Sequence, residues 1–171
     1  MSYNVRLFNL FEWLPNKHVG DTILSFINDQ NPDIICLQEY SESAKVNLRA
    51  YKYKAIFMEG KQIKTGQAIF SKYPIFNQGD FKIPDLGNNV VYADIKKGKD
   101  TIRVYNIHLQ SIKISPDVNE IESHVDAIDQ SKSQQLFVRI REAFKKQEKQ
   151  AEKLVNHRKA CPYPVIICGD M

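Results

Sequence analysis

The chain has 171 residues, which is enough for one domain with a substantial core but too short for two comfortable domains. Hydrophobic residues make up 43% of the sequence and charged residues 26%, close to the average of globular proteins, which excludes disordered, collagen-like and coiled-coil classes. The formal net charge of +4 suits a partner that bears phosphate, but the excess is too modest to establish nucleic-acid binding.

The cysteines favour a reducing compartment, most simply the cytoplasm. There are three of them, Cys36, Cys161 and Cys168, and two lie inside apolar segments, where cysteine usually behaves as a small buried hydrophobic residue. No run approaches the roughly 18 apolar residues of a membrane span, and the N-terminus lacks a signal-peptide pattern. We therefore expect this chain to be soluble, while a membrane tether elsewhere in the parent protein stays open.

The first forty residues have the pattern of a strand, a helix and a second strand. Residues 3–9 alternate apolar and polar side chains, as a half-buried strand does. Residues 16–30 place apolar side chains at helical spacing, and Asn31-Pro32 ends this pattern. Residues 33–39 combine a short apolar run with a final carboxylate. This order predicts a crossover unit that lays residues 33–39 beside the first strand, in a sheet covered by helices.

Short strands are predicted next, with a turn at residues 97–100 that joins the last two into a hairpin. The predicted strands are residues 53–58, 67–71, 75–82, 89–96 and 101–109. Residues 110–130 lose the pattern, and we expect a surface insertion there. A run of short strands after one crossover unit indicates a mixed α/β sandwich and not an all-parallel sheet.

A long helix and a last strand complete the predicted elements. The helix begins at a capping box, residues 131–134, and its charged face, where both signs interleave, is typical of a solvated surface. Its predicted apolar stripe is Phe137, Ile140, Phe144, Ala151 and Leu154. Residues 165–168 are predicted to form a buried strand that ends in Gly169-Asp170.

Polar side chains stand at or near the ends of several predicted strands: Asn4, Glu39, Asn106, His108 and Asp170. Two carboxylates with neutral oxygen donors and water would form an octahedral site suited to Mg²⁺ or Mn²⁺. Such a metal would polarise a phosphoryl oxygen, and His108 could donate a hydrogen bond to that oxygen. Each residue alone has a plainer explanation, as a surface carboxylate, a strand-edge amide or a satisfied core histidine. Their shared position at strand ends favours a common site.

These segments resemble the endonuclease/exonuclease/phosphatase superfamily, which includes DNase I-like nucleases, inositol polyphosphate 5-phosphatases and neutral sphingomyelinases. Residues 33–39, DIICLQE, are similar to its central metal motif and are the most specific match. The other matching segments are residues 3–5, 66–75, 105–109, 150–151 and 163–170. The resemblance covers essentially all 171 residues and implies a DNase I-like four-layer α/β sandwich with mixed sheets.

The resemblance also implies roles for single residues. Glu39 would bind Mg²⁺, with Mn²⁺ as an alternative, and Asn4 would help to hold the metal site. His108 would contact the scissile phosphate and Asp170 would align or deprotonate the attacking water, with Asn106 in the same catalytic set. The family's second half, which carries an Asn two residues after Asp170 and a later Ser-Asp-His type motif, lies beyond residue 171. We therefore expect residues 1–171 to be a partial domain, truncated after the Gly-Asp strand, with little activity of its own.

The predicted function is that of a metal-dependent phosphoric ester hydrolase, a nuclease or a phosphatase, in the parent protein. The alternative is a non-catalytic binding or scaffold member of the family, which the presence of every first-half motif residue argues against only weakly. The substrate stays open among nucleic acid, a phospholipid head group and an inositol phosphate, because Lys61, Lys64 and Lys72 are too few to favour DNA. An unpaired sheet edge is expected to promote self-association.

Overall fold

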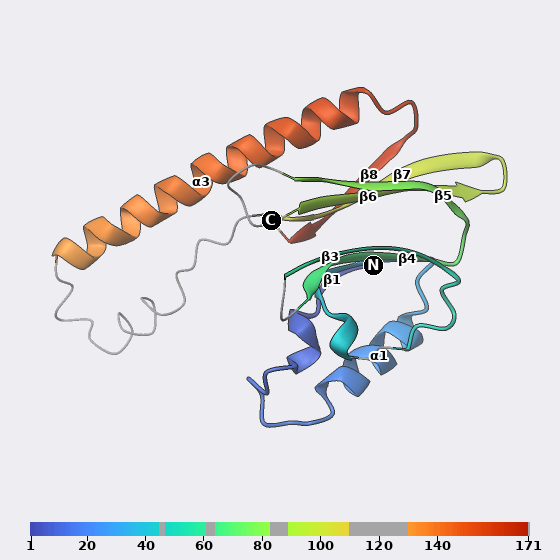
Figure 1. Ribbon diagram of the computed structural model, residues 1–171, viewed down its shortest axis with the longest axis horizontal. Coiled ribbons are helices and arrows are strands. Elements are labelled where there is room, and N and C mark those ends of the chain that lie inside the picture. The colour runs from blue at the N-terminus through green and yellow to red at the C-terminus, as the bar shows by residue number, and fades with distance from the viewer. Residues whose placement is uncertain (45–46, 61–63, 83–88, 110–129, 171) are drawn as a thin grey trace.

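The computed structural model describes residues 1–44, 47–60, 64–82, 89–109 and 130–170. Within these residues the chain forms two four-stranded sheets flanked by helices (Figure 1). In chain order the elements are β1 (Ser2–Asn4), the short helical turn η1 (Arg6–Asn9), α1 (Val19–Gln30), β2 (Ile34–Tyr40), the short turn η2 (Glu42–Ala44), β3 (Tyr53–Glu59), β4 (Thr65–Ser71), β5 (Ile75–Lys82), β6 (Asn89–Lys97), β7 (Asp100–His108), α3 (Gln130–Lys159) and β8 (Val165–Asp170).

Both sheets are mixed. Sheet A has the strand order β1-β2-β4-β3, and sheet B has the order β5-β6-β7-β8. In sheet A the parallel pair is β1 and β2, which α1 connects. In sheet B the parallel pair is β7 and β8, which precede and follow α3 in the same way. The remaining neighbours are antiparallel, including the β6–β7 hairpin that the sequence predicts. The predicted mixed α/β class is confirmed.

Three apolar cores separate four layers, which are α1, sheet A, sheet B and α3 (Figure 1). Ile27 of α1 is fully buried against one face of sheet A. The other face of sheet A packs on sheet B through a core that contains Cys36 and Val91. Leu154 of α3 lies over the far face of sheet B, next to Tyr105. The sandwich that the family resemblance implies is therefore present.

The first strand is shorter than predicted, because β1 ends at Asn4 and the chain enters a left-handed turn. Residues 6–9 all have positive φ, between 43° and 63°, although none is glycine. Left-handed backbone costs such residues about 1–2 kcal/mol each. Burial of Leu7 and Phe8 under sheet A offsets part of this cost. The alternation of residues 3–9 was typical of a strand, but the inward side chains of this turn produce the same pattern.

The predicted stripe of α3 is partly wrong. Phe137 and Phe144 are 72% and 58% exposed, whereas Ala143, Gln150 and Leu154 are buried at a regular helical spacing. The prediction placed polar side chains on the outer face of the helix, but Gln150 lies on the inner face, so the predicted stripe was rotated away from the true one. Residues 110–129 of the predicted insertion and the side chains of residues 131–133 in the capping box lie outside what the structure describes. The last capping-box residue, Gln134, is exposed, and α3 itself begins at Gln130.

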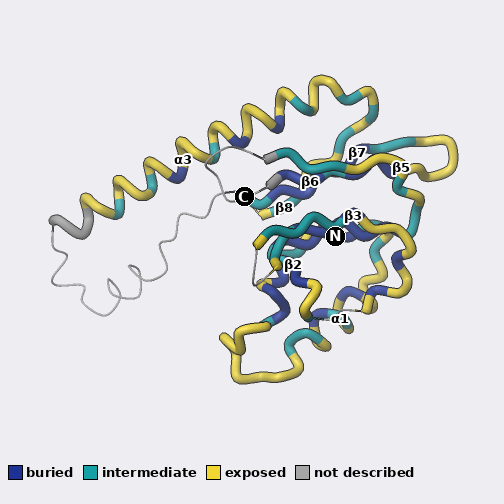
Figure 2. The backbone as a smooth tube through the Cα atoms, in the orientation of Figure 1, coloured by how far each residue is buried: buried dark blue, intermediate teal, exposed yellow. Residues whose placement is uncertain are grey.

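The last strand is also less buried than predicted. Ile166 and Ile167 of β8 are 49% and 41% exposed, because β8 is the edge strand of sheet B. Figure 2 shows exposed residues along most of the outer side of α3 and at the end of the chain. In the part of the chain that the structure describes, no helix combines the length and apolar character needed to cross a membrane.

Candidate active site

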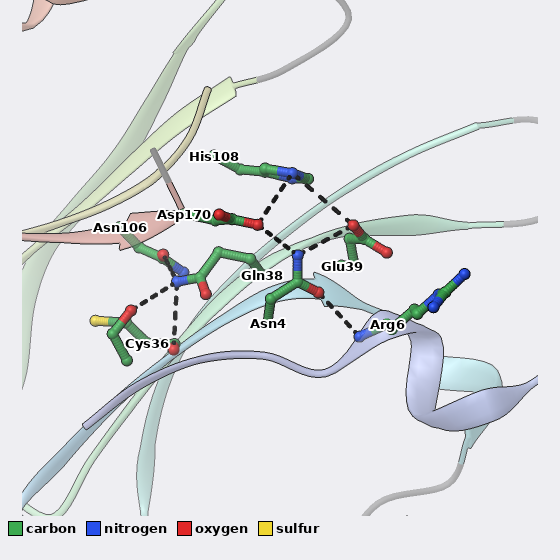
Figure 3. A network of polar contacts seen from close by, with 9 residues as sticks. Asn4, Arg6, Cys36, Gln38, Glu39, Asn106, His108 and Asp170 are labelled. Carbon is green, nitrogen blue, oxygen red and sulfur yellow. Dashed lines mark hydrogen bonds and ion pairs between the residues drawn. The ribbon is translucent and has the colours of Figure 1, made fainter. Parts of the chain in front are cut away.

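The structure brings four of the five predicted site residues together at one edge of the sandwich (Figure 3). Asn4 ends β1, Glu39 lies next to the end of β2, His108 ends β7 and Asp170 ends β8. His108 and Asp170 are directly opposite each other in the parallel β7–β8 pair. Two residues therefore come from sheet A and two from sheet B, so the site spans the junction of the sheets.

The Asn4 side chain connects the two carboxylates. Its Nδ2 donates hydrogen bonds to Glu39 Oε1 at 3.1 Å and to Asp170 Oδ2 at 2.8 Å. Its Oδ1 accepts a hydrogen bond from the backbone N–H of Arg6 at 3.0 Å. In this arrangement Asn4 orients the carboxylates, and its own oxygen is engaged by the backbone of the left-handed turn.

His108 faces both carboxylates. Its Nε2 is 3.9 Å from Glu39 Oε1 and 3.9 Å from Asp170 Oδ2. These distances are too long for direct hydrogen bonds, so the imidazole is hydrogen-bonded to neither carboxylate. The His108 side chain is 19% exposed, and Glu39 and Asp170 are more accessible at 35% and 50%. The three groups can therefore meet a ligand from solvent.

A β-bulge in β2 determines the direction of Glu39. Leu37 pairs with Ala68 and Tyr40 pairs with Gly66, so β2 holds one residue more than its partner strand. Because of this extra residue, Leu37 and Tyr40 both join the core beneath α1. Glu39 lies in the bulge with a φ of 50°. In a regular strand, side chains alternate between the two faces of the sheet, and that of Glu39 would point toward α1; the bulge prevents this.

Gly169 fixes the approach of β8 to β7 immediately before Asp170. Its φ is 151°, and a Cβ at this position would collide with the backbone oxygen of Ile107. A side chain at residue 169 would therefore push the strands apart and move Asp170 away from His108. The Gly-Asp pair is thus required by close backbone packing as well as by the chemistry of the carboxylate.

Asn106, the fifth predicted residue, lies between the sheets and not at the site surface. Its side chain is fully buried, donates hydrogen bonds to the backbone oxygens of Leu37 at 2.9 Å and Ala68 at 3.1 Å, and accepts one from Gln38 Nε2 at 2.6 Å. Asn106 was predicted to be catalytic, but a side chain buried in this way could act only indirectly, by positioning other residues. Gln38 was not among the predicted site residues, although its position two residues after the inward-facing Cys36 indicates that it faces the sheet interface.

The thiol pair beneath the site stays within the core. Cys36 is 1% exposed, and contact with Cys168 together with burial raises its pKa well above the usual range. Cys168 donates to the backbone oxygen of Tyr105 at 3.3 Å. A thiol with a raised pKa remains neutral, which agrees with the expectation that Cys36 acts as a small hydrophobic residue.

The donor chemistry of the edge fits a hard divalent cation. No group of three or more His, Cys, Asp or Glu side chains among the described residues is spaced to enclose a metal ion. Magnesium, however, commonly takes only one or two carboxylates and completes its shell with water and substrate oxygens. Glu39 and Asp170, both within hydrogen-bond reach of one amide, supply such a pair.

A pocket of about 400 Å³ opens next to the site, on the side of the left-handed turn. It shares Asn4 and Arg6 with the site edge, and its wall continues to Trp13 and Leu14 and to Ile23 of α1. A ligand held at the carboxylates would therefore have space to extend in this direction.

The acidic and imidazole groups thus gather where two packed mixed sheets meet. The Endonuclease/Exonuclease/phosphatase family matches the chain over residues 1–171, and the chain belongs to this family.

Several solved structures share the fold of this chain. A humanized D. rerio TDP2 with 14 mutations has a TM-score of 0.64 and 15% identity over 98% of this chain and 58% of that chain. Beta toxin 275-280 from Staphylococcus aureus has a TM-score of 0.61 and 20% identity over 99% of this chain and 64% of that chain. TDP2 from C. elegans has a TM-score of 0.53 and 18% identity over 72% of this chain and 42% of that chain.

The chain thus spans less than two thirds of the length of these proteins. No curated protein sequence matches it significantly. At these identities the likeness establishes the fold and not the activity.

Proposed function

We propose that the domain to which this chain contributes is a divalent-metal-dependent phosphoric ester hydrolase. The observation that carries the proposal is the shared Asn4 amide, which holds Glu39 and Asp170 together while His108 faces both. A purely structural network would pair each acid with a cation. Here the two carboxylates converge on one neutral donor at an accessible edge, which suits them to bind a cation.

Each residue has a distinct role in this proposal. Glu39 holds the cation, with Asp170 able to contribute through water, and Asn4 keeps both acids in place. When bound, the cation supplies Lewis acidity to a phosphoryl oxygen and stabilises the leaving group. Asp170, at 50% exposure, orients the attacking water and accepts its proton.

His108 would stabilise charge on the phosphate. Its Nε2 faces the space between the two carboxylates, and an N–H donor there can bind a non-bridging phosphate oxygen as negative charge increases. The buried pair Asn106 and Gln38 sets the distance between the sheets, so its effect on catalysis would be indirect.

Metal binding by residues 1–171 tests the site without requiring turnover. Calorimetric titration with Mg²⁺ and Mn²⁺ should show binding that Glu39→Gln abolishes. The exposed Glu152 of α3 provides a matched control, and Glu152→Gln should bind metal as the unaltered chain does. Binding that survives Glu39→Gln would contradict the proposal.

Hydrolysis is tested in the longer parent protein and in this chain, with bis(p-nitrophenyl) phosphate as substrate. We expect metal-dependent turnover in the parent that Asp170→Asn or His108→Ala lowers by about 10²-fold or more. We expect little or no turnover from residues 1–171, because the family resemblance implies further catalytic groups. Turnover by residues 1–171 that Glu39→Ala abolishes would show that the chain is sufficient. An inactive parent with an intact metal site would favour the scaffold alternative.

A further inference from the structure

A loop beside the site exposes a compact set of large apolar side chains. In this apolar loop, residues 10–14, Leu10 is 38% exposed, Phe11 48%, Trp13 45% and Leu14 56%. None of the four belongs to the three cores of the sandwich. The loop between η1 and α1 protrudes from the body of the molecule at the end opposite α3 (Figures 1 and 2). Four large apolar side chains exposed within five consecutive residues mark a contact site.

The backbone of the apolar loop is organised by its own hydrogen bonds. Asn9 Nδ2 donates to the backbone oxygens of Leu14 at 2.9 Å and Asn16 at 3.3 Å, and Asn9 Oδ1 accepts from the Leu14 N–H at 2.9 Å. The N–H groups of Leu10 and Glu12 bind the backbone oxygens of Leu7 and Asn9. These internal bonds lower the cost of moving the loop into a medium of low polarity, because fewer amides lose water without replacement.

The apolar loop is continuous with the candidate active site. The Arg6 N–H binds Asn4, and the Arg6 guanidinium lies over the Trp13 ring, 4.9 Å from its centroid. The 400 Å³ pocket is lined by both regions, with Asn4 and Arg6 on the site side and Trp13 and Leu14 on the loop side. A ligand whose phosphate lies at the carboxylates would therefore meet a cation next and an apolar surface beyond it.

We propose that the apolar loop inserts into the interfacial region of a lipid bilayer and presents the site to phospholipids. The order of phosphate site, cation and apolar surface matches the order of phosphate and acyl chains in a phospholipid. Trp, Phe and Leu with nearby Arg6 and Lys17 form the composition of an interfacial anchor. A protruding loop suits a deformable surface, which needs no matching concave partner. The choice of phospholipid as substrate rests on the proposed function, whereas membrane contact does not.

A nucleic-acid partner is less consistent with the same residues. Base stacking needs open aromatic faces, but Arg6 covers one face of Trp13 and Phe11 meets the ring edge-on at 5.2 Å. Leu10 and Leu14 offer neither stacking nor hydrogen bonds to bases. Leucine side chains that are exposed in the free protein suit insertion into lipid, where hydrocarbon would cover them, better than they suit base recognition.

Trp13 is the single tryptophan in the sequence, so intrinsic fluorescence reports directly on the apolar loop. The chain is titrated with vesicles of phosphatidylcholine, alone and mixed with phosphatidylserine. We expect a blue shift of Trp13 emission, with quenching by lipids brominated on their acyl chains. The double variant Leu10→Ser/Leu14→Ser should lower the partition coefficient by about tenfold or more. Phe144→Ser, at a side chain of α3 that is about as exposed as Leu14, should leave partitioning unchanged.

Three results would overturn the proposal: no shift with either vesicle, partitioning that is insensitive to the loop variant, or a Trp13 response to a single-stranded oligonucleotide but not to vesicles. Glu39→Ala separates this proposal from the hydrolase proposal, because it removes the proposed metal ligand and should leave vesicle binding intact. Vesicle binding without metal binding would support the membrane loop alone, and metal binding without vesicle binding would support the hydrolase site alone.

Discussion

The two halves of the sandwich are built on the same plan, two parallel strands with a helix between them in sequence, but they pack differently. In the N-terminal half, α1 packs on sheet A through apolar side chains such as Ile23 and Ile27. In the C-terminal half, α3 covers sheet B through a mixed set in which His157 stacks among aromatic rings and its Nδ1 lies 2.7 Å from the Tyr105 hydroxyl. One half is therefore held by hydrophobic burial, and the other depends also on polar groups that can titrate or lose their partners.

The buried ion pair of sheet B should produce the largest single effect. Arg103 binds Asp94 through Nε at 2.6 Å and Nη2 at 2.8 Å, and Asp94 is 1% exposed. Arg103→Met leaves a buried carboxylate without its cation, which should lower the free energy of unfolding by about 3–5 kcal/mol. Urea denaturation measures this loss. Arg103→Met combined with Asp94→Leu should recover much of it, and a double variant as unstable as the single one would contradict the explanation.

The cost of replacing isoleucine by alanine compares the packing of the two halves directly. Ile35 of β2 is fully buried and Ile167 of β8 is 41% exposed. Ile35→Ala should cost about 3 kcal/mol of unfolding free energy, and Ile167→Ala less than about 1 kcal/mol, because only the first leaves a cavity. Equal losses in urea denaturation would mean that β8 is as well covered as β2 in solution.

The bridge between the sheets should have an intermediate effect. Asn106→Ala removes three buried hydrogen bonds, which join its side chain to the backbone oxygens of Leu37 and Ala68 and to the Gln38 amide. We expect a loss of about 2 kcal/mol in unfolding free energy, together with weaker metal binding, because Glu39 and Asp170 belong to different sheets. Asn28→Ala on the exposed side of α1 is the control. Unchanged metal affinity in Asn106→Ala would show that the site does not depend on this bridge.

The exposed edge of β8 should promote association between copies of the chain. We expect residues 1–171 to self-associate in sedimentation equilibrium, since unpaired backbone groups and exposed Ile166 and Ile167 can pair with a second copy. Ile167→Lys should shift the distribution toward monomer. A clean monomer for the unaltered chain at high concentration would refute this expectation.

The smallest expected effect is a dependence of stability on pH in the C-terminal half. Burial, with a contribution from nearby Arg103, lowers the pKa of His157 below its usual 6.5. The folded state therefore favours the neutral ring, and the unfolded state binds the proton more readily. The stability that this group provides is present above pH 6.5 and is lost as the pH falls below it. His157→Gln should flatten this part of the profile in thermal unfolding measured between about pH 5 and pH 7.5.

Much of the fold could be predicted because it follows from local patterns. The crossover unit, the hairpin and the long helix all have clear periodicities, and Glu39 and Asp170 follow apolar strands. The bulge that turns Glu39 toward the site has no such signal, because it depends on how β4 pairs with β2. The left-handed turn at residues 6–9 imitates a strand, and Asn106 resembles a site residue although it is buried between the sheets.

The hydrogen bonds of the Asn4 amide can form only late in folding. The two carboxylates that it holds come from sheets that must first dock, and they are 131 residues apart in Glu39 and Asp170. A nascent or partly unfolded chain therefore has the separate acids but no assembled centre. Under the proposed function, such a chain would be catalytically silent, and hydrolysis would begin only when closure of the sandwich is complete.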